Sequence, residues 1–154
     1  MLIKLTVNGI PRQAECAPNE YLSDVLRRLG CLSVRQGCDT GTCGACTIHL
    51  DGVAVLSCIT LAAQAQGKAV TTLEGVPEKA RAVGALLVDE GADQCGFCSA
   101  GLIMNILYLE TMVCDPTDAD IAHYLNGNLC RCTGYAGQLR AVRRYFEVKA
   151  HENR

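Results

Sequence analysis

The stretch QGCDTGTCGACT, residues 36–47, places Cys38, Cys43 and Cys46 in a loop that is rich in glycine. Glycine reaches backbone angles that other residues avoid, so this loop can fold tightly around a small centre. Backbone N–H groups in such a loop can point toward a single anionic group. Cys58 follows after a short hairpin and can return to the loop. The four thiols therefore predict a metal centre.

The spacing of this first set indicates which kind of centre it binds. Its opening, C-x4-C-x2-C, is the plant-type ferredoxin pattern for a [2Fe–2S] cluster. Zinc also binds four thiolates, but a long spacing with three glycines is unusual for zinc. We therefore interpret the first set as cluster ligands: Cys38, Cys43, Cys46 and Cys58.

A second set of four cysteines lies further along the chain, in the order C-x2-C and then C-x-C: Cys95, Cys98, Cys130 and Cys132. Its first pair opens an expected helix over residues 96–113, and a helix N-terminus favours thiolates. Taken alone, C-x2-C fits a zinc site and an iron–sulfur site equally well. Arg131 places a positive charge between the last two ligands.

The composition agrees with a folded metalloprotein. The 154 residues include 11 cysteines, 49% hydrophobic residues and a net charge of -2. An odd cysteine count without a signal peptide or a membrane-spanning stretch predicts a cytoplasmic protein with reduced thiols. No basic stripe indicates nucleic acid. We expect the three remaining cysteines to be small buried residues, and His49 to face solvent; these cysteines are Cys16, Cys31 and Cys114.

Two domains are expected, over residues 1–76 and 77–154. In the first, Asn8-Gly9 and Asp51-Gly52 predict hairpin turns, and Asn19 predicts the N-cap of a helix that ends at Gly30. The second has the periodicity of helices over residues 78–90, 96–113, 117–127 and 138–149, and we expect Thr117 to cap the third. The fold class predicted from these patterns is α+β.

Three segments together resemble the iron–sulfur subunit of the xanthine dehydrogenase (molybdenum hydroxylase) family. They are residues 36–47, the sequence QCGFC at 94–98, and the sequence GNLCRCTGY at 127–135. The resemblance covers nearly the whole chain in the same order. It implies a ferredoxin-like β-grasp domain followed by a four-helix bundle, each holding one [2Fe–2S] cluster.

The resemblance also implies cofactors and partners. A large subunit would carry a molybdenum–pterin cofactor and oxidise the substrate, and a medium subunit would usually carry FAD. Electrons would pass from molybdenum to the second cysteine set, then to the first set, and then to FAD or another acceptor. Gln94 matches the glutamine that contacts the pterin, and its amide has the donors and acceptor for that contact.

The chain departs from the family pattern at two places. Ser99-Ala100-Gly101 stands where the family usually has Thr-Pro-Gly, and Ala136-Gly137-Gln138 stands where most members soon have Ile or a similar residue. Neither change touches a ligand. Two other functions remain open from the residues, namely a freestanding ferredoxin-like electron carrier and a zinc-stabilised adaptor without redox activity.

The charge of Arg131 generates a first prediction. Replacing Arg131 with Glu is expected to lower the reduction potential of the second cluster, because a nearby negative charge disfavours adding an electron. A potentiometric titration of the two proteins measures the change. An unshifted potential would contradict the prediction.

Overall fold

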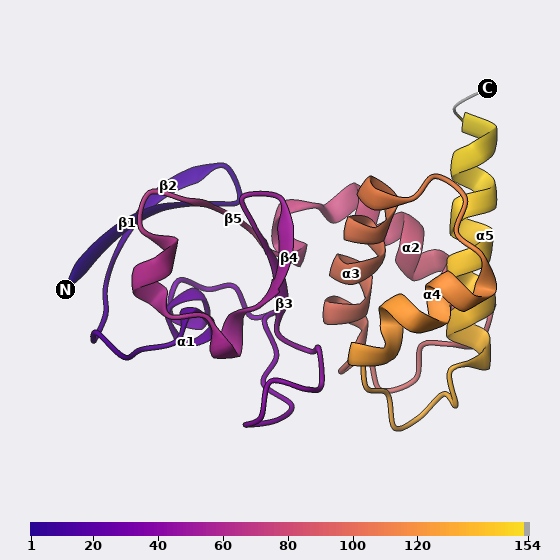
Figure 1. The fold of residues 1–154 in the computed structure, drawn as a ribbon, viewed down its shortest axis with the longest axis horizontal. Coiled ribbons are helices and arrows are strands. Elements are labelled where there is room, and N and C mark those ends of the chain that lie inside the picture. The colour runs from indigo at the N-terminus through magenta and orange to yellow at the C-terminus, as the bar shows by residue number, and fades with distance from the viewer. Residues whose placement is uncertain (153–154) are drawn as a thin grey trace.

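The computed structural model describes residues 1–152 and contains one five-stranded sheet and five α-helices (Figure 1). The spatial order of the strands is β2-β1-β5-β3-β4. The α+β class predicted from the sequence is confirmed. The strands are β1 (Leu2–Val7), β2 (Ile10–Glu15), β3 (Thr47–Leu50), β4 (Val53–Leu56) and β5 (Ala69–Thr71).

Two antiparallel hairpins form most of the sheet. β1 pairs with β2 and β3 pairs with β4, while β5 joins the hairpins by running parallel to β1 and antiparallel to β3. The turns lie where they were predicted. Asn8 and Gly9 have φ of 52° and 79°, and Asp51 and Gly52 have φ of 51° and 83°. Both residues of a type I′ turn require positive φ, which Asn-Gly and Asp-Gly supply readily.

Helix α1 (Leu22–Arg28) packs its apolar side chains against this sheet. The prediction that Asn19 is its N-cap is wrong, since the N-cap is Tyr21. Tyr21 stays extended because it forms a β-bridge with Leu61, and the N–H of Leu22 donates to the carbonyl of Thr60 at 2.8 Å. A long-range pairing thus delays the start of the helix.

The remaining helices share a second apolar core, which runs from Val83 to Phe146. They are α2 (Pro77–Asp89), α3 (Ser99–Met112), α4 (Asp118–Tyr124) and α5 (Ala136–Glu152). Thr117 caps α4 as predicted, because its hydroxyl accepts the N–H of Asp120 at 3.2 Å. No helix within the described residues is long and apolar enough to cross a membrane.

The start of α3 was expected at residue 96, but the helix begins at Ser99. Gly96 has φ of 71°, which is outside the right-handed helical region, so residues 95–98 form an irregular segment that ends in a turn before the helix. The cysteines of this segment therefore precede the helix rather than lie in its first turn. Cys98 is its N-cap residue.

Helix α3 lies against β3 and β4 and joins the sheet to the helices (Figure 1). The closest approach is at Gly101, where an added Cβ would lie 2.1 Å from the carbonyl oxygen of Gly44. His49 does not face solvent as expected, because its Nε2 lies 2.8 Å from the carbonyl oxygen of Met104. Both contacts tie the first cysteine loop and its following strand to α3.

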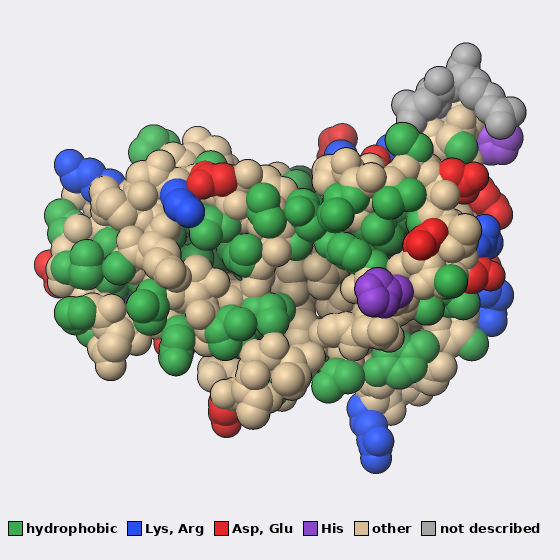
Figure 2. All heavy atoms as spheres, viewed as in Figure 1, with side chains coloured by type: hydrophobic (Ala, Val, Ile, Leu, Met, Phe, Trp, Pro, Cys, Tyr) green, Lys and Arg blue, Asp and Glu red, His purple; other side chains and the backbone are tan. Residues whose placement is uncertain are grey.

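Ion pairs hold α5 against the C-terminal end of α2. Arg140 and Arg144 both bind Glu90, each at 2.8 Å. Charged side chains gather along this side of the molecule, whereas hydrophobic side chains are spread over the rest of the visible face (Figure 2). A Cβ on Gly137 would lie 2.7 Å from the carbonyl oxygen of Glu90, so glycine permits the two helices to meet here.

The contact at Gly101 generates a prediction about stability. Replacing Gly101 with Ala forces α3 away from Gly44 and is expected to lower the free energy of unfolding by about 1–3 kcal/mol. Gly84→Ala in α2 is the matched control, because no atom lies within 4 Å of the added methyl group. That change is expected to stabilise the helix by up to about 1 kcal/mol. Denaturant unfolding of both variants measures the difference, and equal effects would contradict the close contact.

Candidate metal centres

The first cysteine set comes together at the end of the β3–β4 hairpin opposite its Asp51-Gly52 turn. The loop between α1 and β3 carries three of its members, and the turn that follows β4 carries Cys58. The Sγ atoms of Cys46 and Cys58 lie 3.2 Å apart. The thiol of Cys43 in turn donates to the sulfur of Cys38. The structure thus places the four cysteines of the first set near one another.

The second cysteine set comes together where two helices begin. Cys95 and Cys98 precede α3, and Cys130 and Cys132 precede α5. The Sγ atoms of Cys95 and Cys132 lie 3.6 Å apart, and the thiol of Cys98 donates to the sulfur of Cys130. Segments that are more than thirty residues apart in the sequence thus supply one site.

Each set is arranged as two close pairs of sulfurs. All the cysteines are free thiols in the structure. A tetrahedral zinc site needs four ligands around one ion, whereas two bridged iron ions divide four thiolates between them. The pairing therefore fits a [2Fe–2S] cluster in each set.

Hydrogen bonds stabilise the thiolate form at one sulfur of each set. Backbone N–H groups of the loop, chiefly that of Thr42 at 3.4 Å, lower the pKa of Cys38 to about 5. Burial acts to raise the pKa of Cys130, but hydrogen bonds that include the hydroxyl of Thr133 at 3.2 Å outweigh it and lower the pKa to about 7. The lowered pKa values favour the thiolate form at these two sulfurs.

Burial and crowding oppose ionisation at one other sulfur of each set. Burial and the adjacent Cys46 raise the pKa of Cys58 to about 12. Burial and the adjacent Cys130 raise the pKa of Cys98 to about 11. Four thiolates can therefore coexist in either site only with a strong positive charge between them, which ferric iron supplies.

The two sites open onto one cavity of about 360 Å³. The first set contributes Cys43 to its wall, and all four cysteines of the second set line it as well. The loops are also bonded directly, because the N–H of Leu129 donates to the carbonyl of Cys43 at 2.9 Å. Residues adjacent to one site thus contact a cysteine of the other.

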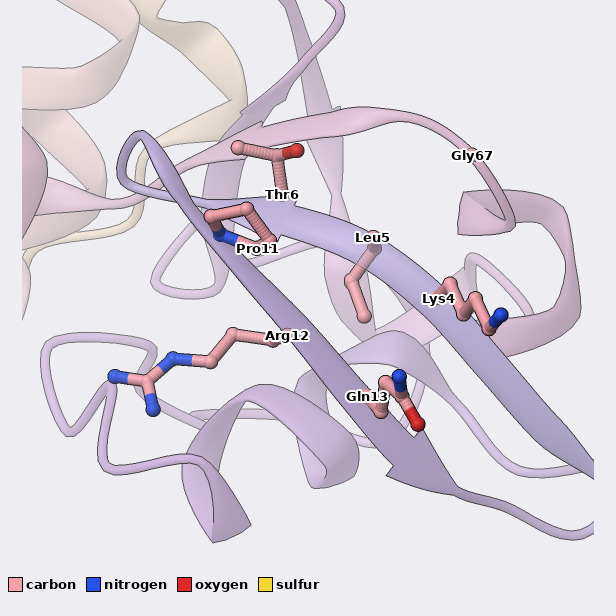
Figure 3. A pocket seen from close by; sticks show the side chains of 7 residues that line it. All are labelled: Lys4, Leu5, Thr6, Pro11, Arg12, Gln13 and Gly67. Atoms are coloured by element: carbon pink, nitrogen blue, oxygen red, sulfur yellow. The ribbon is translucent and has the colours of Figure 1, made fainter.

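Another hollow is lined by residues of β1, β2 and the loop before β5. It has a volume of about 270 Å³ and lies over the hairpin of β1 and β2, with Gly67 at one end (Figure 3). Lys4, Arg12 and Gln13 supply its polar groups, and Arg12 points away from the other two (Figure 3). Its lining residues include neither a cysteine nor an acidic group, so we assign it no part in the metal sites.

Two residues singled out in the sequence lie at the exposed edge of the second site. Gln94 and Arg131 are both exposed, as are the adjacent Cys95 and Cys132. Ser99, one of the departures from the family pattern, donates its hydroxyl to Asp93 at 2.8 Å. This edge of the site is open to a partner molecule.

Sequence reasoning missed a side chain that contacts a cysteine sulfur. Gln138 is 4% exposed, and its Nε2 lies 3.8 Å from Sγ of Cys98. The signal was present in the segment Ala136-Gly137-Gln138, which departs from the family pattern. Reasoning also missed Tyr135, whose hydroxyl accepts the N–H of Cys130 at 2.9 Å.

The three cysteines outside the two sets do not share one environment. Cys16 and Cys31 are buried, as expected. Cys114 is exposed, so the expectation that it is buried is wrong. It lies in the connection between α3 and α4, where the chain passes over the surface.

A polar network ties the two cysteine loops to α3. The side-chain amide of Asn105 donates to Oδ1 of Asn128 at 2.8 Å and to Oγ1 of Thr47 at 3.4 Å. Thr47 follows a cysteine of the first set and donates in turn to the carbonyl of Gly44 at 2.7 Å. Asn128 is 5% exposed, so its oxygen depends on this donor.

Removing that donor is expected to destabilise the protein. Asn105→Ala leaves the buried oxygen of Asn128 without the amide and should lower the free energy of unfolding by about 1–3 kcal/mol. Asn126→Ala at an exposed position is the control and should change it by less than about 0.5 kcal/mol. Denaturant unfolding compares the two variants. Similar values would show that the network contributes nothing.

Two family models together match most of the chain. The model described as a 2Fe-2S iron-sulfur cluster binding domain matches residues 5–73, and the model described as a [2Fe-2S] binding domain matches residues 72–143. The chain is 47% identical to the xanthine dehydrogenase iron-sulfur-binding subunit of Escherichia coli O157:H7, over 86% of each chain. It is 43% identical to the nicotinate dehydrogenase small FeS subunit of Eubacterium barkeri, over 92% of each.

Solved structures have the same fold. A chain of quinoline 2-oxidoreductase from Pseudomonas putida 86 superposes with a TM-score of 0.90 and 36% identity, over 99% of this chain and 96% of the other. The two cysteine sets, the matches to [2Fe–2S]-binding models and these relatives agree with one another. The chain belongs to the iron–sulfur subunits of the xanthine dehydrogenase (molybdenum hydroxylase) family.

Proposed function

We propose that this chain is the electron-transfer subunit of a heteromeric molybdenum-containing hydroxylase or dehydrogenase. It would receive electrons from the molybdopterin centre of a large subunit. It would then pass them to FAD on a medium subunit, or to another acceptor. The observation that carries the proposal is the common cavity, which brings Cys43 of the first set to the four cysteines of the second. A [2Fe–2S] cluster takes up and releases one electron at a time, which is the chemistry that such a relay needs.

The ligands that we propose follow the two sets. Cys38, Cys43, Cys46 and Cys58 would hold one cluster, and Cys95, Cys98, Cys130 and Cys132 would hold the other. The close sulfur pairs support this assignment. So do the raised pKa values of Cys58 and Cys98, because these thiols need a cation beside them to ionise.

The order of the relay is also a proposal. The second set would lie next to the pterin, with Gln94 as the contact to that cofactor. Gln94 supports this role because it is exposed beside Cys95, at the edge where the second site opens to solvent. The first set would lie toward the flavin, so that electrons leave the molybdenum centre through the helices and exit through the sheet.

We propose that the chain consists of two domains with a boundary after residue 76. The first, residues 1–76, would be a ferredoxin-like β-grasp domain, and the second, residues 77–154, a four-helix bundle. The two separate apolar cores support this division. Contacts of α2 with α3 and α5, and of α4 with α5, support the bundle. A cytoplasmic location stays a prediction from the cysteine content.

Electron paramagnetic resonance of the dithionite-reduced complex tests the function, with iron and sulfide measured on the same sample. Two S = 1/2 signals with about four iron and four sulfide per chain are expected. Cys130→Ser should remove one signal, while Cys114→Ser at an exposed cysteine outside both sets should leave both. A single signal with half the iron would favour a freestanding carrier, and zinc without a signal would favour the adaptor.

A further inference from the structure

A buried amide contacts one sulfur of the second cysteine set. Gln138 lies in the first turn of α5, and its side chain is 4% exposed. Its Nε2 lies 3.8 Å from Sγ of Cys98. Glutamine is usually exposed, and burying its amide is unfavourable unless the amide finds hydrogen-bonding partners. Here the sulfur of Cys98 is a partner.

Neighbouring residues hold this amide in place. Tyr135 precedes α5 and has φ of 68°, and its hydroxyl accepts the N–H of Cys130. Its carbonyl accepts the N–H of Leu139 at 2.9 Å, which fixes the first turn of the helix. Gly137 lets this turn pack closely against the carbonyl of Glu90. The position of Gln138 is therefore set from both sides by the cysteine loop and by α2.

We propose that Gln138 is a positioning and tuning residue that donates an N–H···S hydrogen bond to the Cys98 thiolate and raises the reduction potential of the second cluster. The proposal rests on the proposed function, since it requires a cluster on the second set. Reduction adds one electron and makes the cluster and its sulfurs more negative. A donor to sulfur stabilises that form more than the oxidised form, so the potential rises.

The donors at the other sulfurs differ in kind. Cys130 receives the hydroxyl of Thr133, which belongs to the Cys-Thr-Gly-Tyr segment that the family shares, and Cys38 receives the backbone N–H of Thr42. Gln138 lies in the segment Ala136-Gly137-Gln138, where most members of the family soon have Ile or a similar residue, and an aliphatic side chain cannot donate. Gln138 therefore adds to the second site a hydrogen bond that an aliphatic side chain at that position could not form.

The consequence for the relay concerns the distribution of electrons. A higher potential at the second site favours transfer from the partner's molybdenum centre onto this chain. It makes the next transfer, in which the second cluster is oxidised and the first is reduced, less favourable by the same amount. Gln138 would thus increase the fraction of singly reduced chains in which the electron resides on the second cluster.

The test is a potentiometric titration of the complex followed by electron paramagnetic resonance. Gln138→Met keeps the length of the side chain and removes the amide. At a given potential, the ratio of oxidised to reduced second cluster should rise severalfold, up to about tenfold. A tenfold rise corresponds to a fall of about 59 mV in the reduction potential of a one-electron couple. The first cluster should not change. Gln13→Met, at an exposed position in β2, is the matched control and should leave both potentials unchanged.

Two further readouts separate this proposal from the proposed function. Gln138→Leu has a different shape and should lower the potential to a similar degree, whereas an unshifted second cluster in both variants would overturn the tuning role. If either variant loses iron, the hydrogen bond is tested instead in the wild-type complex. Its glutamine side chains are labelled with ¹⁵N and the complex is measured by pulsed electron paramagnetic resonance. A ¹⁵N coupling to the reduced second cluster is expected, and its absence overturns the proposal. Failure of the proposed function would instead remove the second signal from the wild type.

Discussion

Repulsion between crowded thiolates is the constraint on which this structure depends. Pairs of sulfurs lie 3.2 Å and 3.6 Å apart, and the pKa values of Cys58 and Cys98 rise to about 12 and 11. Ionising all four thiols of a set is therefore unfavourable until metal ions neutralise their charge. Hydrogen bonds from the surrounding chain favour the charged form at two of the sulfurs. Backbone amides donate to Cys38, and a hydroxyl donates to Cys130. The sheet and the helices are thus scaffolds for two anionic sites.

The two scaffolds meet where the sites are nearest each other. Gly44 and Gly101 allow backbone contact, and the amide of Leu129 bonds directly to the carbonyl of Cys43. Asn105 adds side-chain hydrogen bonds on the same face of α3. A relay needs a fixed distance between its centres, and rigid backbone contacts supply one more reliably than flexible side chains would. The interface therefore belongs to the function as much as the cysteines do.

Local chemistry allowed much of this to be predicted from the sequence. Asn8-Gly9 and Asp51-Gly52 form their turns, and Thr117 caps its helix. Two of the errors have one cause, which is long-range contact. Tyr21 stays extended because of Leu61, and His49 turns toward Met104 instead of solvent. Gln138 was visible only as a departure from a pattern, because nothing local shows which sulfur its amide reaches.

The glycine pair at the interface has an evolutionary consequence. A side chain at position 101 would strike the carbonyl of Gly44, and one at position 44 would strike the carbonyl of Gly127 at 2.3 Å. A substitution on either side therefore requires the backbone of the other half to move. The two cluster-binding halves are expected to be inherited as a unit, and a chimaera that joins halves from distant relatives should need its interface redesigned before electrons can cross it.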